Sequence, residues 1–264
     1  MLTVVKNYIK LLYKYKVLNI SASMEYKVSF ILQIVLMILN NASFLIVWGA
    51  LFTVNKSIGG YEFKDVMLLW AISSSSFGFC YVLFGNGRKV MSLIINGELD
   101  VYLLQPKNLL FNVLVSETSI SAIGDILYGY IILIILGADI KLWAMFSLFV
   151  VVSGIIMAMF GVIIHSLTFY LNNIKEFINN MEMLAVSFSI YPEGIFGGFV
   201  KLLLYTVIPT GFMVYIPVSV MRQFDMGLFL EVIAFAVFET IAAIVIFNSG
   251  LKRYGSGNMM NMRG

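Results

Sequence analysis

Long apolar runs separated by short polar stretches constrain the fold of this chain more than any other feature. A helix needs about 20 mostly apolar residues to cross the hydrocarbon core of a bilayer. Charged residues make up only 12% of the 264 positions, too few to cover a water-soluble surface. The sequence therefore predicts an all-α integral membrane protein, a single transmembrane domain over residues 1–264, with six transmembrane helices at 28–54, 65–85, 116–137, 141–170, 177–191 and 228–249.

The first 26 residues are more polar than the runs that follow. Lys6, Lys10 and Lys14 recur every four residues on one helical face, and aliphatic and aromatic residues fill the rest of the wheel. This pattern predicts that residues 1–26 form an interfacial amphipathic helix in the lipid headgroup region. A solvated helical tail is the alternative.

A second irregular segment, 195–219, lies before the last apolar run. It contains Pro209, Gly211 and Pro217, and Pro192 stands at its edge. Proline interrupts a helix, and broken helices at membrane depth persist only where protein or water satisfies the freed backbone groups. We therefore expect a re-entrant helical hairpin here, before the sixth span.

The distribution of Lys and Arg predicts the side of the membrane that each connection faces. Six crossings place the amino end, 86–112, 171–176 and the carboxyl end together, and these segments carry Lys6, Lys10, Lys14, Lys16, Lys27, Arg88, Lys89, Lys107, Lys175, Lys252, Arg253 and Arg263. The opposite side carries only Lys56, Lys64, Lys141, Lys201 and Arg222. Cytoplasmic connections are enriched in positive residues, so both termini are expected in the cytoplasm.

The residues needed for enzymatic chemistry are missing from the sequence. Cys80 is the only cysteine and His165 the only histidine, so no metal site of the usual His and Cys spacing is expected. No Gly-Lys-Ser/Thr sequence is present to bind phosphate. We expect no catalytic residues, no cofactor bound by this chain and no nucleic-acid partner, with membrane lipid as its surroundings.

Ionisable residues that interrupt the apolar runs include Asp125, His165, Glu239 and, near the start of a span, Glu117. Ionisable groups at membrane depth are costly, and they mark either transport pathways or paired contacts between helices. For Asp125 and Glu239 both interpretations remain open. His165 lies near the expected cytoplasmic end of the span 141–170, and this position favours a structural role at the membrane interface.

The 86–112 segment is the longest polar excursion between two spans. Residues from Arg88 to Asn96 can form a short amphipathic helix that Gly97 would end, and Pro106 stops the helix that follows. From Gly97 to Pro106 the sequence resembles the G-x-[LI]-D-x-x-L-x-x-P pattern of a bacterial ABC type-2 permease family. Tyr191-Pro192, Ile208-Pro209 and Tyr215-x-Pro217 also look like the proline-marked region of that family.

The resemblance implies a cytoplasmic coupling helix after the second span. This region, with Arg88, Lys89, Gly97, Glu98, Asp100 and Pro106, would dock on a separate ABC ATP-binding subunit, which would hold the ATP and Mg. The family further implies the cytoplasmic membrane of a bacterium, and a permease dimer formed with a second copy or with a related permease chain. A transport path would lie between the two halves, lined by the second and fifth spans.

The function expected from this resemblance is the transmembrane subunit of an ATP-driven exporter for an amphiphilic drug, peptide or lipid-like substrate. An ion- or proton-coupled secondary transporter is one alternative, although such carriers tend to have broken helices in both halves. A membrane scaffold or immunity protein without transport is another.

Overall fold

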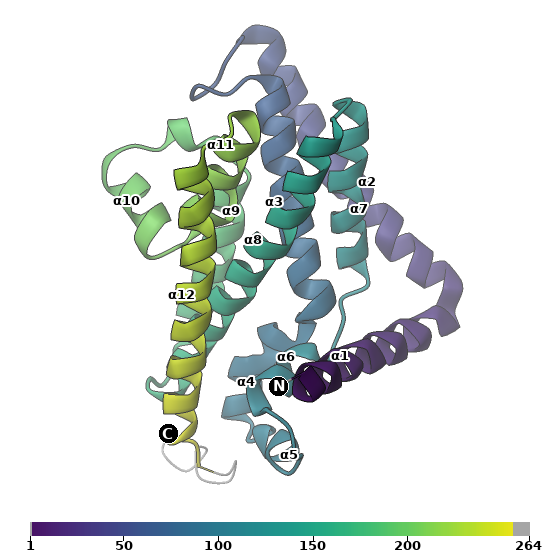
Figure 1. Ribbon diagram of the computed structural model, residues 1–264, viewed down its shortest axis with the longest axis vertical. Coiled ribbons are helices and arrows are strands. Elements are labelled where there is room, and N and C mark those ends of the chain that lie inside the picture. The colour runs from purple at the N-terminus through teal and green to yellow at the C-terminus, as the bar shows by residue number, and fades with distance from the viewer. Residues whose placement is uncertain (1, 256–264) are drawn as a thin grey trace.

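A computed structural model describes residues 2–255, which form helices and turns and no strand (Figure 1). The longer helices are α1 (Leu2–Ser23), α2 (Lys27–Val54), α3 (Phe63–Leu83), α7 (Ser121–Ile135), α8 (Ile140–Ser166), α9 (Lys175–Ser189) and α12 (Met226–Leu251). Shorter pieces are the 3-10 turns η1 (Met24–Tyr26), η2 (Gly85–Lys89), η3 (Leu167–Phe169) and η4 (Glu193–Ile195), the helices α4 (Val90–Ile95), α5 (Leu99–Leu103), α6 (Leu109–Val115), α10 (Gly198–Thr206) and α11 (Ile216–Arg222), and the π-helical turn η5 (Gly211–Tyr215).

Four helical stretches are long and apolar enough to cross a membrane: Lys6–Val54, Phe63–Leu83, Ile140–Phe169 and Met226–Leu251. There is a fifth candidate span if the bent pair Gly198–Thr206 and Gly211–Arg222 is counted as one span. At 15 residues each, α7 and α9 extend about 22 Å, less than the hydrocarbon core of about 30 Å. The chain is therefore an all-helical, multi-pass protein with four to five candidate spans, and the number six stays a prediction.

Two of the helices start at side-chain caps that set their boundaries. Asp139 accepts a hydrogen bond from the Leu142 N–H at 2.8 Å at the start of α8, and Asp225 accepts one from the Leu228 N–H at 3.0 Å at the start of α12. Each cap satisfies one of the free N–H groups of a helix terminus. The observed α8 and α12 consequently agree closely with the expected 141–170 and 228–249.

The helix α3 runs through the centre of the bundle and packs closely on α7. Ser73 to Ser76 are all buried, and the Ser75 hydroxyl donates to the Ile126 carbonyl at 3.2 Å. Opposite them, a Cβ atom on Gly129 would meet the Ser75 hydroxyl and the Ala71 carbonyl. Small residues allow membrane helices to approach this closely, and here they fix α7 against α3.

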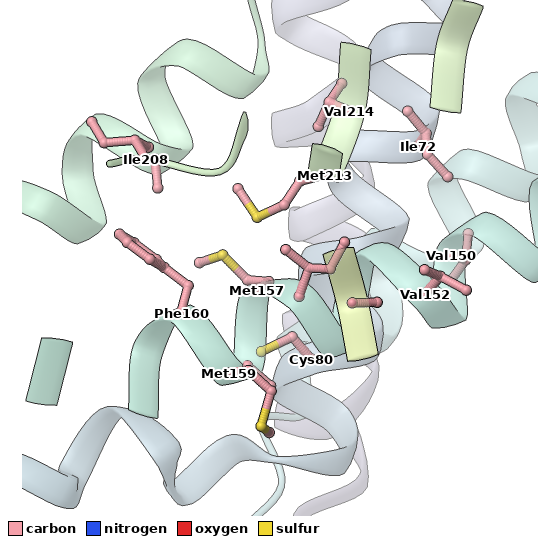
Figure 2. Packing of buried hydrophobic residues seen from close by; sticks show 14 of the residues in the cluster. Ile72, Cys80, Val150, Val152, Met157, Met159, Phe160, Ile208, Met213 and Val214 are labelled. Carbon is pink, nitrogen blue, oxygen red and sulfur yellow. The ribbon is translucent and has the colours of Figure 1, made fainter. Parts of the chain in front are cut away.

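The apolar core extends from α3 to α8 and the 208–214 segment. Figure 2 shows Cys80 of α3, Met157 of α8 and Met213 of η5 in the same cluster. Long unbranched methionine side chains fill irregular gaps between helices, which suits a core that includes a broken segment.

The predicted irregular segment before α12 is broken at Pro209. The axes of α10 and Gly211–Arg222 differ by 78°, and Ile208 and Pro209 lie in the break. Gly211 is required because the Tyr205 ring occupies the place of a side chain, and Pro217 follows the π-helical turn, which accommodates its missing N–H. Pro192 stands between α9 and η4.

Both ends of the described chain lie at the same end of the bundle as α4, α5 and α6, and α1 lies across that end (Figure 1). Lys6, Lys10 and Lys14 of α1 are exposed, as their helical spacing predicts. Arg263, counted with the carboxyl-terminal charges, lies outside the described residues.

Candidate functional site

The 86–112 segment folds into a compact cap of four short helices, η2, α4, α5 and α6. Its helix α4 ends where the sequence predicts, because Gly97 adopts a left-handed φ of 74° and the Glu98 N–H donates back to the Leu93 carbonyl at 2.9 Å. Asn86 is buried, and its Nδ2 lies 2.8–3.2 Å from the Ser116 hydroxyl, the Val113 carbonyl and the Tyr102 hydroxyl. This amide fixes η2 against both α5 and α6.

A lysine from α1 holds the end of α6. The buried Lys16 Nζ donates to the Val115 carbonyl at 3.1 Å, the Glu117 carbonyl at 2.8 Å and the Thr118 hydroxyl at 3.0 Å. A cation suits a helix carboxyl terminus, where the last carbonyls lack partners. Residues 116–120 beside it are not helical, and α7 begins at Ser121, five residues after the expected 116.

We expect Lys16→Met to destabilise the protein. The methionine keeps the apolar stem but leaves buried carbonyls without a donor, at a cost of about 1–3 kcal/mol. Thermal unfolding in detergent measures this, with Lys14→Met as the matched control because Lys14 is exposed on the same helix. Equal melting temperatures for the two variants would contradict the role of Lys16.

The predicted coupling residues occupy different surroundings. Arg88 is exposed with its guanidinium 4.4 Å from the centre of the Tyr81 ring, and Lys89 pairs with Glu117 at 2.7 Å. The two acidic residues of this set, Glu98 and Asp100, differ in their surroundings. Glu98 is exposed at the end of the cap and accepts from the Asn96 amide at 3.2 Å.

Asp100 faces the carboxyl-terminal end of α12 instead of lying free at the tip. Burial raises the pKa of the Tyr254 phenol, and the neighbouring Asp100 carboxylate raises it further, to about 12. Asp100 thus contributes to the contact between α5 and the end of the chain. Pro106 is exposed in the turn that separates α5 from α6.

The sequence interpretation missed several exposed apolar side chains at the end of α4 and along α5 and the residue after it. Leu104 is 88% exposed and Val101 63%, and Leu103 and Ile95 are also exposed. We call these four residues the apolar tip. A five-residue helix is too short to reveal a polar and an apolar face by periodicity, so no sequence signal separated them from the buried Leu99.

His165 connects three helices near this cap. The ring is 2% exposed, its Nδ1 accepts from the Met91 N–H of α4 at 3.3 Å, and its Nε2 lies 3.0 Å from Glu182 Oε1 of α9. Met91 is in the first turn of α4, where N–H groups lack helical partners, so the ring caps that helix. The structural partners of His165 are Met91 and Glu182, and the spacing of residues in the sequence did not indicate either of them.

A cavity of about 300 Å³ lies between α2, α3, α7 and α9. Its lining combines the rings of Phe44, Trp70, Phe77 and Tyr81 with the polar residues Asn40, Asn41, Ser73, Ser74, Arg88, Ser119, Ser121 and Asp125. Asp125 accepts a hydrogen bond through Oδ1 from the Asn41 amide at 2.7 Å, and its second oxygen has no hydrogen-bond partner among the described residues. The cavity therefore offers aromatic surface and one unsatisfied carboxylate oxygen to a ligand.

Glu239 lies on the inner face of α12. It is buried, and its Oε2 has no hydrogen-bond partner within the part of the chain that the structure describes. Across residues 2–255, no hydrogen bond joins Asp125, His165 and Glu239 to one another. The three polar residues belong to separate places: the cavity, the base of the bundle and α12.

Comparison with known proteins adds a finding to this geometry. A family model described as "ABC-2 family transporter protein" matches residues 38–257, most of the chain. A search of curated proteins and a search of solved structures both returned no match.

Proposed function

The chain belongs to the ABC-2 transporter family, and from that premise we propose that it is the permease of an ATP-driven exporter that moves an amphiphilic drug, peptide or lipid-like substrate out of a bacterial cell. Membership makes it a multi-pass membrane transport subunit. The family works with an ABC ATP-binding subunit, which in this proposal holds the ATP and Mg.

The observation that carries the proposal is the apolar tip at the end of the 86–112 cap. Leu104 and Val101 are exposed in the same short segment as the exposed Glu98, and aliphatic side chains at an interface centre with polar groups at the rim are typical of protein docking surfaces. We assign this surface to the ATP-binding subunit. Glu98 and Pro106 would lie at its margin, and Asp100 would support it through the end of α12. Arg88 and Lys89 belong to the same proposed coupling region but contact Tyr81 and Glu117.

Movement of the cap would reach the bundle through His165. The hydrogen bond from Met91 to His165 joins α4 to α8, and the contact of His165 with Glu182 continues to α9. In the proposed mechanism, ATP binding draws the ATP-binding subunits together, and the cap transmits this displacement to the spans.

The cavity supports a substrate of amphiphilic character. It is lined by α3, and by Val186 of α9 and Ile190 directly after it. In this proposal α3 would be the second span and α9 the fifth. Its volume falls at the lower end of the range of about 300–1,000 Å³ for small-molecule sites. Apolar parts of the substrate would contact the aromatic rings, and a polar or cationic group would reach Asp125.

The membrane arrangement in this proposal has six crossings, at α2, α3, α7, α8, α9 and α12, with 195–219 re-entrant. Both termini and the cap would face the cytoplasm, in keeping with their common end of the bundle and with the excess of Lys and Arg there. Two permease chains, alike or related, would form the complete transmembrane unit.

The direct test is affinity purification of the tagged chain from native membranes in mild detergent, followed by mass spectrometry. We expect an ABC ATP-binding subunit to co-purify in stoichiometric amount, and ATP hydrolysis to accompany it. A folded chain that is reproducibly recovered alone would contradict the exporter. Asp125→Asn and Glu239→Gln would then test a proton-coupled carrier, since such a carrier needs no ATP.

A further inference from the structure

Two adjoining hollows lie beside α1, the helix that crosses the cap end of the bundle (Figure 1). The first has a volume of about 480 Å³ and is formed by α1, the start of α6 and α12, and we call it the apolar hollow. Its lining residues are Tyr8, Ile9, Leu12, Asn108, Phe111 and Ile244. None of them lines the cavity between α2, α3, α7 and α9, so the hollow is a separate place on the molecule.

The apolar hollow presents mainly hydrocarbon to an occupant. Ile9 is 62% exposed and Ile244 42%, and the rings of Tyr8 and Phe111 meet edge to face with their centres 5.0 Å apart. The Asn108 side chain already caps α6, because it accepts from the Phe111 N–H at 3.0 Å. Exposed apolar surface of this kind in a membrane protein suits a hydrocarbon chain.

The position of Ile244 along α12 gives the depth of the apolar hollow. With 26 residues α12 is about 39 Å long, close to the bilayer thickness of about 40–45 Å with both polar layers included. Ile244 lies seven residues, or about 10 Å, before the last residue of the helix, Leu251. Each polar layer is about 5–8 Å thick, so Ile244 reaches the level of the acyl chains. The hollow therefore lies in the leaflet at the cap end, which is the cytoplasmic leaflet in the proposed membrane arrangement.

The second hollow shares Tyr8 with the first but has a different character. It has a volume of about 320 Å³, and we call it the polar hollow. Its lining residues are Asn7, Tyr8, Leu11, Pro106 and Lys107. Lys14 follows Leu11 by three positions and Asn7 by seven, so it lies on the same face of α1. Lys14 and Lys107 are both exposed, and their ammonium groups are available to an occupant of this hollow.

No acidic side chain neutralises these two lysines. In the part of the chain that the structure describes, neither forms an ion pair, and the Lys107 Nζ lies 6.0 Å from the centre of the Tyr15 ring. Neither hollow is lined by an Asp or a Glu, and α1 contains lysines but no acidic residue. Unopposed positive charge beside an apolar hollow is complementary to a molecule with an anionic head and a hydrocarbon tail.

We propose that the two hollows bind one anionic phospholipid of the leaflet at the cap end, with an acyl chain in the apolar hollow and the phosphate at Lys14 and Lys107. A soluble anion would leave the apolar hollow empty, and a zwitterionic lipid carries a cation of its own that competes with the lysines. The bound lipid would contact α1, the cap and α12, which are far apart in the sequence, and it should stabilise their arrangement. The site lies outside the proposed transport path.

Native mass spectrometry of the purified chain in detergent measures this binding. The probe is dioleoylphosphatidylglycerol, and dioleoylphosphatidylcholine, with the same acyl chains, is the comparison. One lysine beside an anionic lipid contributes about fivefold in affinity, so the chain should bind one phosphatidylglycerol about 25-fold more tightly than phosphatidylcholine. The double variant Lys14→Gln, Lys107→Gln should lose this preference. Lys175→Gln, which removes an exposed lysine at the start of α9, is the matched control and should keep it.

A second pair of variants tests the apolar hollow. Ile244→Trp places a large ring in the hollow and should lose the bound phosphatidylglycerol. Val245→Trp is the control, because Val245 is 56% exposed and lies outside the lining, and it should retain the lipid. Thermal unfolding in the same detergent checks that each variant is folded. Added phosphatidylglycerol should raise the melting temperature of the parent chain and of Val245→Trp, but not that of Ile244→Trp.

Several outcomes would overturn the lipid site. Equal affinity of the parent chain for the two lipids would do so, as would an equal loss of preference in Lys175→Gln. Displacement of the lipid by glycerol phosphate at equal concentration would indicate a site for soluble anions instead. Loss of phosphatidylglycerol binding in Asp125→Asn would place the lipid in the cavity.

The measurement is independent of the exporter proposal because no ATP-binding subunit takes part in it. A bound lipid in a chain that recovers no such subunit would retain the lipid site and remove the proposed function, and a recovered subunit without lipid preference would do the reverse. If the double lysine variant does not fold, Lys107→Gln alone should reduce the affinity for phosphatidylglycerol about fivefold, and an unchanged affinity would contradict the site.

Discussion

Replacement of Leu104 with aspartate should abolish ATP-driven transport and leave the chain folded in the membrane. The side chain is 88% exposed, so the substitution removes no packing within the chain. A charge in the centre of an apolar docking surface should weaken binding by about 2 kcal/mol or more, or about 30-fold in affinity for the ATP-binding subunit. Pull-down of the ATP-binding subunit and transport into inverted vesicles would both measure the loss.

The matched control is Ile140→Asp. Ile140 is equally exposed but begins α8 at the opposite end of the bundle from the cap (Figure 1). An aspartate is tolerated in the first turn of a helix, so this variant should fold and retain the ATP-binding subunit. Equal retention by the Leu104 and Ile140 variants would show that the apolar tip does not dock the partner.

Gly129→Ala should have the largest effect on folding. The added Cβ would meet the Ser75 hydroxyl and approach the Ala71 carbonyl to 2.7 Å and the Phe146 ring to 2.9 Å. Because one of these contacts is with backbone, α7 must move away from α3, and the cost should reach the upper end of the range of about 1–3 kcal/mol for overpacking. The fraction of monodisperse protein in size-exclusion chromatography should fall sharply.

Gly161→Ala is the corresponding control on α8. No heavy atom lies within 4 Å of a Cβ at Gly161, and alanine favours helix more than glycine. This variant should be at least as stable as the parent chain. A Gly129→Ala protein as monodisperse as Gly161→Ala would mean that α3 and α7 are less closely packed than their glycines and serines indicate.

The sequence alone was sufficient to predict the helices whose ends are determined locally. The predicted spans 28–54, 141–170 and 228–249 match α2, α8 and α12 within a few residues. Each is a long apolar run, and Asp139 and Asp225 mark two of the starts because a carboxylate caps free N–H groups of the following helix. The residues that determine these helix ends lie within a few positions of the ends themselves.

Features that depend on distant partners could not be predicted. Residues 116–120, expected within the span 116–137, lie outside α7, and Lys16, about a hundred positions earlier, contacts Glu117 and Thr118 there. Likewise, the partners of Asp125 and His165 come from helices whose packing had to be known first. For the coupling residues, the family resemblance located the 86–112 segment but did not distinguish the exposed Leu104 from the buried Leu99.

The contacts of His165 determine where its proton resides. A backbone N–H can only donate, so the contact with Met91 requires an unprotonated Nδ1, and the proton of the neutral ring must then sit on Nε2 and point at Glu182. The imidazole acts as a directional connector, an acceptor toward α4 and a donor toward α9. Neither helix can move away from α8 without breaking one of these bonds.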